Sequence, residues 1–454
     1  MGTTQSRGES EWKGPFSDEE YDRLVVVYQE ITSGKSNAAT QQALQERLTL
    51  PLHDDLPSEW REGLGRLGAS FFELCLHSRE LAGSSDTSTQ LKLNDFVQGV
   101  AQCIRASSQA IYRSLFHLFV VDKKSAYLNE DEVHQLLLAC LLMTNAQIAD
   151  EEPRELVRMI KKLAESALPT TTGDSTRQLS MDEFLRWSSA QLPLMFSAFT
   201  TWISKCFLDS LARAAYNPPV LTHKSDILSK TQFGALSLIY TPLQKRMDRL
   251  YTNAKDGLSF NRLCYHILGY GGPTLIVIRD TDGDVFGMYC DTEWRETTKF
   301  YGGNGCFLFR VEPYINVYRV SASDANENYM YLNTKGFALP KGIGMGGTLN
   351  GFRLFLNEDF DDNCYSAAKC LSFEPGRLTK KDQFAMDAIE VWGCGGDESL
   401  QRQGQVRKDT AEMLDKMRKV DKAAFVGNDF DRSMFLGKTF GHGTDQARIA
   451  DDEH

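Results

Sequence analysis

The chain has 454 residues, a length that predicts two or three domains and excludes a single small scaffold. Hydrophobic residues make up 42% and charged residues 24% of the sequence, so the chain can bury a core and is not disordered overall. Acidic residues outnumber basic ones by 61 to 50, and the formal charge of -11 argues against broad attraction to nucleic-acid phosphates.

The amino terminus, Met-Gly-Thr-Thr-Gln-Ser, places Gly2 and Ser6 in the pattern for N-myristoylation after removal of Met1. We therefore interpret residues 1–16 as a lipidated tail, with a solvated tail that fits the pattern by chance as the alternative. One myristoyl chain gives only marginal membrane binding, on the order of 10⁴ M⁻¹, and few basic residues follow it. Membrane attachment is expected to be reversible and assisted by a partner.

Residues 17–216 carry apolar side chains at spacings of three and four, as in ASFFELCLH and SQAIYRSLFHLFV, which predicts a helical domain. Three places in it resemble the helix-loop-helix of EF-hands, because a hydrophobic residue is followed four places later by an acidic one and then by a helix. They are residues 91–95, 128–132 and 179–183.

Calcium coordination needs oxygen ligands at the first, third and fifth loop positions and a glycine at the sixth. In the clearest copy Val121 and Lys123 occupy the first and third positions, and Ala126 the glycine position. Thr89 and Arg177 stand at the glycine position of the other two copies. We interpret the array as a degenerate EF-hand-like domain used for packing or partner binding, with a calcium sensor as the alternative.

The most apolar stretch, residues 192–208, is shorter than the ~20 residues of a bilayer span and is interrupted by polar side chains. It predicts a buried helix. The ten cysteines are scattered singly and no signal-peptide pattern opens the chain, so we expect reduced thiols in the cytosol. A disulfide framework or a structural zinc site is not favoured.

Asn217-Pro-Pro ends the helical pattern, and short alternating runs separated by turn residues follow. Helices are expected around residues 232–240 and 259–268, and a hairpin at Thr281-Asp-Gly-Asp between residues 275–279 and 285–290. Several such strands indicate an antiparallel sandwich. The other expected strands are residues 306–311, 316–321, 329–333, 352–357, 370–373 and 388–394.

Residues 222–395 resemble a TLDc domain, the domain of the oxidation-resistance and nuclear-receptor-coactivator relatives, through the order and spacing of several short motifs. These are Ser237-Leu-Ile-Tyr, Asp256-Gly-Leu-Ser-Phe, Gly272-Pro-Thr-Leu-Ile-Val-Ile, Asp282-Gly-Asp-Val-Phe-Gly, Gly305-Cys-Phe-Leu-Phe, Tyr329-Met-Tyr-Leu-Asn and Glu390-Val-Trp-Gly. Gly342-Ile-Gly-Met-Gly-Gly, the amino-terminal pattern and the helical front half are similar to the mTOR-associated, lysosomal TLDc subfamily. Two loops depart from the family pattern, at Ser321-Ala-Ser-Asp-Ala and near Ser366, where a glycine is expected.

The resemblance implies an α+β chain in which the EF-hand-like helical domain precedes a two-sheet TLDc sandwich with flanking helices and a carboxy-terminal helix. It implies no catalytic centre, no cofactor and no metal. It also implies a regulator that binds the vacuolar-type proton ATPase and TOR-pathway proteins. Such a protein is expected in the cytoplasm, held peripherally on lysosomal or other endomembranes.

Other motifs allow chemical interpretations that the sequence does not favour. Gly342-Ile-Gly-Met-Gly-Gly fits G-x-G-x-x-G, but strand-like residues follow where a dinucleotide site needs a helix, so we predict a loop with positive φ or close backbone approach. The acidic run at residues 358–362 is interpreted as a solvated loop. A Cys-His nucleophile pair or an oxidation-resistance function through thiols would require groups that nothing in the sequence brings together. The candidates are Cys364, Cys370, Cys394, His266 and His442.

Residues 397–422 carry charges of both signs and a narrow apolar stripe, which predicts an exposed helix. The stripe consists of Val406, Met413, Leu414, Met417 and Val420. It either binds a partner or packs back on the sandwich, and the sequence leaves both alternatives open. Residues 423–454 are interpreted as a flexible tail.

Overall fold

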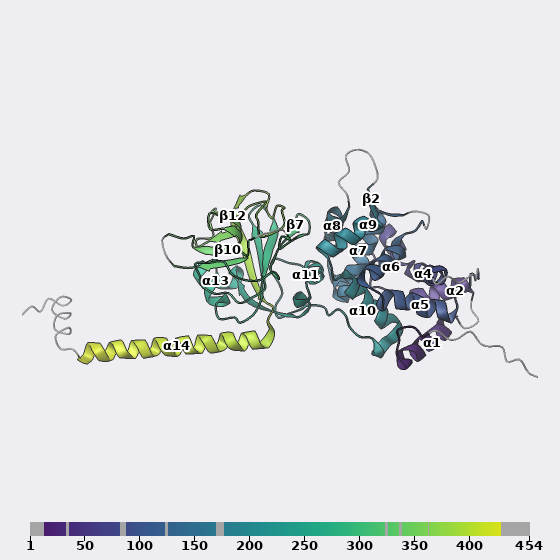
Figure 1. Cartoon of the computed structure of the whole chain (residues 1–454), viewed down its shortest axis with the longest axis horizontal. Coiled ribbons are helices and arrows are strands. Elements are labelled where there is room, and N and C mark those ends of the chain that lie inside the picture. The colour runs from purple at the N-terminus through teal and green to yellow at the C-terminus, as the bar shows by residue number, and fades with distance from the viewer. Residues whose placement is uncertain are drawn as a thin grey trace, which may run out of the picture.

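The computed structural model describes residues 13–32, 36–81, 88–122, 126–168, 177–322, 326–335, 338–361 and 363–427. Gly2, His442 and the predicted tail beyond residue 427 lie outside the described residues. The chain forms a helical half, up to residue 216, and a sheet half, residues 217–395, which lie side by side and are followed by one long helix (Figure 1). Within the described ranges, no helix is both long enough and apolar enough to cross a bilayer.

The helical half confirms the predicted helical pattern. Polar N-caps start several of its helices, because the Ser107 and Asn129 side chains accept backbone N–H groups in the first turn. The apolar stretch predicted as a buried helix forms α10 (Met195–Leu208). The other elements are α1 (Asp18–Thr32), α2 (Asn37–Arg47), α3 (Ser58–Leu64), α4 (Leu67–Leu81), α5 (Leu93–Ile104), α6 (Ser108–Phe119), α7 (Glu130–Thr144), η1 (Ala146–Asp150), α8 (Pro153–Ala167), α9 (Met181–Gln191) and η2 (Asp209–Leu211).

Two of the EF-hand-like segments pair through their loops. Strand β1 (Tyr127–Asn129) runs antiparallel to β2 (Gln178–Ser180), with Leu128 opposite Leu179. Each strand leads directly into a helix whose first turn is closed by a reciprocal capping box, Asn129 with Glu132 before α7 and Ser180 with Glu183 before α9. The acidic residues that a calcium loop would use as bidentate ligands therefore hold backbone N–H groups here.

The sheet half is a sandwich of two sheets with helices at its margins. Among the described residues, the larger sheet has the strand order β3-β4-β14-β5-β6-β7-β8 and the smaller sheet β13-β12-β11-β10-β9. All pairings are antiparallel except that of β3 with β4. The larger sheet contains β3 (Val220–Leu221), β4 (Arg246–Thr252), β5 (Thr274–Asp280), β6 (Val285–Cys290), β7 (Phe307–Glu312), β8 (Asn316–Arg319) and β14 (Met386–Gly393). The smaller sheet contains β9 (Met330–Asn333), β10 (Gly342–Thr348), β11 (Gly351–Asn357), β12 (Cys364–Ser366) and β13 (Gln383–Phe384). The helical segments are α11 (Lys230–Ser237), η3 (Thr241–Gln244), α12 (Asn253–Asp256) and α13 (Phe260–Ile267).

One loop prediction and one strand prediction were wrong. The glycine-rich segment predicted as a loop is strand β10, paired on both sides. The predicted positive φ is present at Gly346 and Gly347. The predicted close approach is also present, because a Cβ on Gly344 would lie 2.4 Å from the Phe352 ring. Residues 370–373, predicted as a strand, form only an isolated bridge between Phe373 and Val320. This segment crosses the end of β8, where Ser321 N donates to Ser372 O and Glu374 N donates to Arg319 O.

Both faces of the larger sheet are covered. Its inner face packs on the smaller sheet, with Ile276 and Met288 in the same core as Ile343 and Leu354. Its outer face, which includes Val277, Phe309 and Trp392, belongs to one continuous core with the helical half. The two halves are therefore separate in sequence but share a hydrophobic interior.

Helix α11 is the element through which this shared core is built. Phe233 packs edge-on against Trp392 of the larger sheet, with ring centroids 5.5 Å apart. On the opposite side, Gly234 lies against Thr144 and Ile148 of the helical half. In Figure 1, α11 lies between the sheets and helices α7 and α8.

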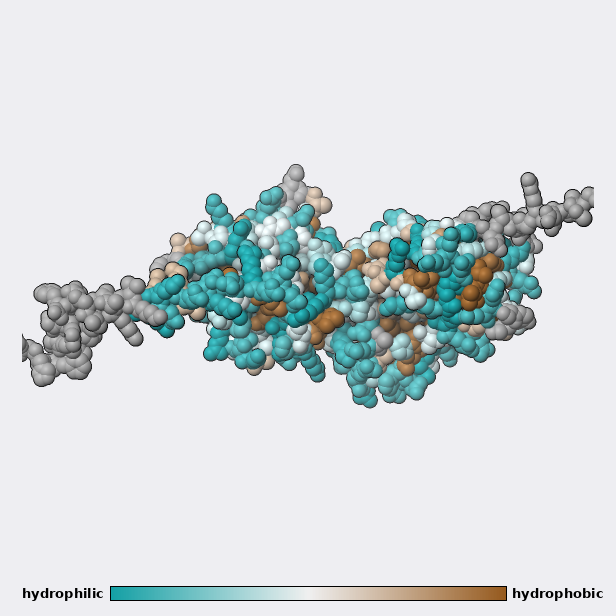
Figure 2. Space-filling model, turned by 90° about the horizontal axis from the view of Figure 1, so that it is seen from below, coloured by the Kyte–Doolittle hydropathy of each residue, from teal (hydrophilic) through white to brown (hydrophobic). Residues whose placement is uncertain are grey.

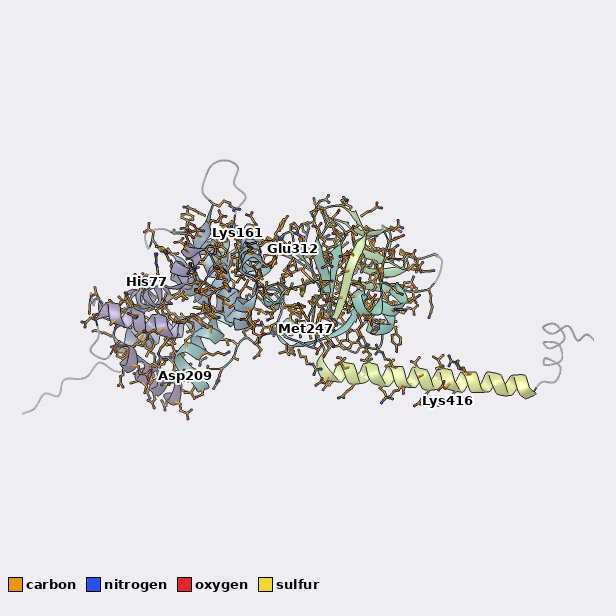
Figure 3. All side chains as sticks on the ribbon, turned by 180° about the vertical axis from the view of Figure 1, so that it is seen from behind. His77, Lys161, Asp209, Met247, Glu312 and Lys416 are labelled. Atoms are coloured by element: carbon orange, nitrogen blue, oxygen red, sulfur yellow. The ribbon has the colours of Figure 1, made fainter. Side chains whose placement is uncertain are left out.

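Polar contacts fix the same junction. The Glu312 carboxylate pairs with Lys162 and with Arg158, at 3.4 Å, and accepts a hydrogen bond from Gln232 Nε2. Glu151 of the helical half accepts the backbone N–H groups of Lys230 and Thr231 at the start of α11. In Figure 3, Glu312 and Lys161, the neighbour of Lys162, mark the two sides of this junction.

We expect Phe233→Ala to lower the free energy of unfolding by about 3–5 kcal/mol, because it opens a cavity in the core that both halves share. Leu371→Ala, at an exposed side chain of the sheet half, is the control and is expected to change stability by less than about 0.5 kcal/mol. Urea unfolding followed by both near-ultraviolet and far-ultraviolet circular dichroism measures the effect. Equal stabilities of the two variants would contradict a shared core.

Candidate functional site

In the first EF-hand-like segment, the acidic residue Asp95 is paired with a buried arginine. Arg79 of α4 is buried, and its Nε donates to Asp95 Oδ1 at 2.9 Å. Its terminal nitrogens donate to Asp95 Oδ2 and to the backbone oxygens of Ser88 and Gln90. A guanidinium therefore occupies the place between carboxylate and carbonyl oxygens where a cation would bind. Within the described ranges, no group of three His, Cys, Asp or Glu side chains is placed to hold a metal ion.

The cysteines are free thiols, and eight of the ten are buried. Burial raises the pKa of Cys264, Cys306 and Cys394 to about 12, which suppresses the reactive thiolate. Cys206 is partly exposed, yet burial raises its pKa to about 12 as well. Cys370 is the other partly exposed thiol and accepts a hydrogen bond from Phe373 N.

The sequence-predicted chemical candidates are not brought together as a reaction centre. Cys364 Sγ donates to Asn357 Oδ1, and Cys394 is buried beside Trp392. His266 lies 3.8 Å from Asp256 and against the Tyr251 ring. In the acidic run, Asp361 accepts hydrogen bonds from the backbone N–H of Asn363 and from the side chains of Asn357 and Asn363, which lowers the pKa of its carboxyl group.

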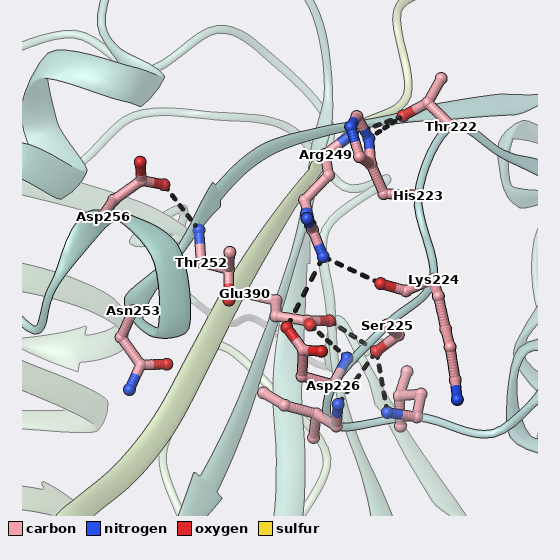
Figure 4. Close-up of polar contacts among 12 residues, drawn as sticks. Thr222, His223, Lys224, Ser225, Asp226, Arg249, Thr252, Asn253, Asp256 and Glu390 are labelled. Carbon is pink, nitrogen blue, oxygen red and sulfur yellow. Dashed lines mark hydrogen bonds and ion pairs between the residues drawn. The ribbon is translucent and has the colours of Figure 1, made fainter.

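A buried carboxylate ties the linker between β3 and α11 to the larger sheet. Glu390 of β14 is fully buried and accepts hydrogen bonds from Ser225 Oγ at 2.6 Å, Asp226 N at 2.7 Å and Trp392 Nε1 at 3.1 Å. Arg249 donates to Lys224 O and forms an ion pair with Asp226. Figure 4 shows the contacts of Glu390 and Arg249 with the segment from Thr222 to Asp226. The Ser225 hydroxyl also accepts two backbone N–H groups, so its oxygen is fully used in holding the linker.

This linker forms one wall of a cavity of about 1110 Å³ at the junction of the two halves. The other wall comes from η1 and the start of α8. Acidic side chains, among them Glu152 and Glu155, and basic ones, among them Lys224 and Arg279, line it together. The mixture of charges gives the cavity no preference for a ligand of one sign.

The final helix, α14 (Gly396–Gly427), confirms the predicted helix and continues five residues beyond its predicted end. Its first turns are anchored on the sheet half. Gln403 is buried and donates to His266 O, and Arg402 pairs with Glu293 at 2.8 Å. Arg407 lies over the Tyr265 ring, 4.7 Å from its centroid. Beyond this anchor, α14 extends away from both halves (Figure 1).

The residues of the predicted apolar stripe have different surroundings in the structure. Val406, at the end of the anchor, lies beside Gly269 of the sheet half. Met413, Leu414 and Met417 are 59%, 50% and 53% exposed and lie on the projecting part of the helix. The backbone of Val420 belongs to α14, and its side chain lies outside the described residues. Figure 2 shows the side of the molecule on which α14 lies, where brown patches are separated by hydrophilic surface.

Sequence reasoning missed the residues that join the halves. Glu312, Glu151 and Ser225 carried no recognisable motif, because their role depends on partners more than 75 residues away in the sequence. Glu390 was noticed only as part of a family motif. The polar residues that follow Pro218-Pro219 were the available signal for a held linker.

Two packed sheets with flanking helices, extending from β3 to β14, have the architecture of a TLDc domain. Residues 221–395 match the TLDc domain family, so this part of the chain is a TLDc domain.

Among its relatives, the MTOR-associated protein MEAK7 of Gallus gallus is 37% identical over 182 residues, which are 38% of this chain and 38% of that protein. The protein of the same name from Homo sapiens is 37% identical over 148 residues, 32% of each chain. Nuclear receptor coactivator 7 of Gallus gallus is 30% identical over 176 residues, 38% of this chain and 18% of that protein. The chain therefore aligns with less than two fifths of the length of each of these relatives.

The thiols allow a direct test of redox chemistry. We expect Cys370 to be the thiol that reacts fastest with 5,5′-dithiobis-(2-nitrobenzoate) in the native protein, because it is partly exposed, whereas eight of the other thiols are buried and burial raises the pKa of Cys206 to about 12. Cys370→Ser should remove the fast phase, and the buried Cys364→Ser should leave it unchanged. Several thiols reacting equally fast in the native protein would contradict this expectation.

Proposed function

We propose that this chain is a non-catalytic adaptor or regulator of the mTOR-associated TLDc type. It works on a cytoplasmic membrane surface, lysosomal or another endomembrane, and docks on the vacuolar-type proton ATPase through the TLDc domain and α14. TOR-pathway proteins are its further partners. The relatives named MTOR-associated protein support the link to TOR, and the resemblance to the TLDc family supports the pump as partner.

The observation that carries this proposal is the projecting part of α14. It presents Met413, Leu414 and Met417 on a helix whose other end is fixed to the TLDc domain. An amphipathic helix with an unpartnered apolar stripe suits docking on a groove or on another helix. Because α14 is tethered to the domain, a second contact through it would add avidity to a first contact through the TLDc surface.

The rival classes have less support. A thiol-based protector needs accessible thiolates, and burial raises the pKa of Cys206, Cys264, Cys306 and Cys394. A calcium sensor needs loop oxygens, and Arg79 uses those of the first segment.

We expect Met413→Asp to weaken capture of the purified proton pump by about tenfold or more, because burial of a methionine side chain contributes roughly 1.5–3 kcal/mol. Lys408→Asp places an aspartate on the opposite face of α14, away from Met413, Leu414 and Met417, and is the control. Both positions are exposed, so both variants should fold like the native chain. Binding is measured by biolayer interferometry with immobilised pump. Equal affinities of the two variants would remove the stripe from the interface, and no binding by the native chain would overturn the proposal.

Membrane attachment through Gly2 is tested separately. We expect Gly2→Ala to abolish N-myristoylation and to lower the fraction of the chain that floats with liposomes, since one acyl chain supplies marginal affinity. Gly8→Ala, which leaves the myristoylation pattern intact, should float like the native chain. Mass spectrometry of chain produced with N-myristoyltransferase confirms the modification. Equal flotation of both variants would exclude the lipid as the anchor.

A further inference from the structure

Two arginines at one end of the TLDc sandwich are buried without an acidic partner. Arg310 of β7 is 5% exposed, and Arg353 of β11 is fully buried. Within the described ranges, neither guanidinium forms an ion pair, and the Nε atom of each has no hydrogen-bond acceptor. Buried cations are normally paired, because removing a charge from water is costly. Two such groups in one domain therefore point to an anion.

The two side chains come from opposite sheets, and the charges of both act on Tyr318. On β7, Arg310 lies two residues beyond Leu308, which is opposite Tyr318 of β8, so the side chains of Arg310 and Tyr318 share the inner face of the larger sheet. From the smaller sheet, the Arg353 guanidinium carbon lies 5.3 Å from the centroid of the Tyr318 ring. Burial raises the pKa of Tyr318, and the positive charges of both arginines oppose that rise.

The hydrogen bonds leave donors in both groups. The terminal nitrogens of Arg353 donate to the backbone oxygens of Ala367 and Gly376. Arg310 donates to the side-chain oxygen of Asn316 at 3.2 Å, in the amide orientation that satisfies both polar atoms of that side chain. The Tyr314 ring, 38% exposed, lies over the Arg310 guanidinium with its centroid 3.7 Å away. Rotation of Tyr314 would open a path from solvent to Arg310.

We propose that Arg310 and Arg353 form a binding site for a small inorganic oxyanion, of the size of phosphate or sulfate, beneath Tyr314. A planar guanidinium presents N–H groups that match the oxygens of such an ion, and the low polarity of the surroundings strengthens the attraction. Glu312 of the same strand holds Lys162 and Arg158 of the helical half. The bound anion would therefore stabilise the strand end at which the two halves join.

Isothermal titration of the full chain with inorganic phosphate, at constant ionic strength, tests the site. We expect saturable binding with a Kd in the millimolar range or tighter, and a loss of about tenfold or more in affinity for Arg310→Met, because a charge-assisted hydrogen bond is removed. Arg154→Met removes the same charge from an exposed position of α8 and should bind phosphate like the native chain. Absence of saturable binding, or equal affinity of both variants, would overturn the proposal.

Crystals of the native chain grown with selenate provide a measurement that does not depend on the folding of a variant. An anomalous selenium peak within hydrogen-bond distance of Arg310 or Arg353 is the expected result. A peak elsewhere would overturn the site. A peak at the arginines combined with no phosphate binding in solution would mean an adventitious ion only, and it would overturn the proposal equally.

Discussion

The fold depends on the need to cover both faces of the larger sheet. The run Leu275-Ile-Val-Ile in strand β5 has no polar residue on either face, so neither face can be left in water. The smaller sheet covers one face, and α11 with the helical half covers the other. The EF-hand-like helices therefore cover one face of the TLDc domain's larger sheet, and this covering is a structural role for the helical array.

Contacts between different parts of the chain also satisfy the buried polar side chains. Glu390 lies in a central strand, where an unpaired carboxylate would be strongly destabilising, and it accepts three hydrogen bonds. Two of these hydrogen bonds come from the linker, so the bonds that satisfy the buried carboxylate also fix the wall of the junction cavity. Arg79 and Asp95 solve the corresponding problem in the helical half, since each neutralises the other away from water.

The sequence predicted those parts of the fold that are encoded by local periodicity. The hairpin at Thr281-Asp-Gly-Asp and the helix at residues 192–208 follow from turn chemistry and apolar spacing, and both are present. Strand β10 was missed because four of the six residues in its Gly342–Gly347 segment are glycine, a composition that locally favours a loop. It is a strand because neighbouring aromatic rings such as Phe352 occupy the space that side chains would take, and this packing is invisible in one segment alone.

The candidate functional surface on α14 was likewise predictable only where local spacing encodes it. The exposed stripe on α14 could be found from helical spacing, whereas its anchoring depends on Gln403 and Arg402 meeting residues more than 100 positions earlier. Sequence alone therefore left open whether the stripe packs back on the domain. In the structure Met413, Leu414 and Met417 are exposed and do not pack on the domain. Val406, in contrast, lies against Gly269 of the domain.

The placement of α14 also constrains how the chain could bind a large assembly. A helix of 32 residues is about 48 Å long, and its anchor at one end fixes the direction in which the stripe projects. Helix α1, which follows the amino-terminal tail, lies at the opposite end of the long axis of the molecule (Figure 1). The first described helix and the exposed stripe of α14 therefore lie at opposite ends of a body whose halves share one core. Separating the halves would expose this shared core to water, so the two ends are expected to keep a set distance from each other.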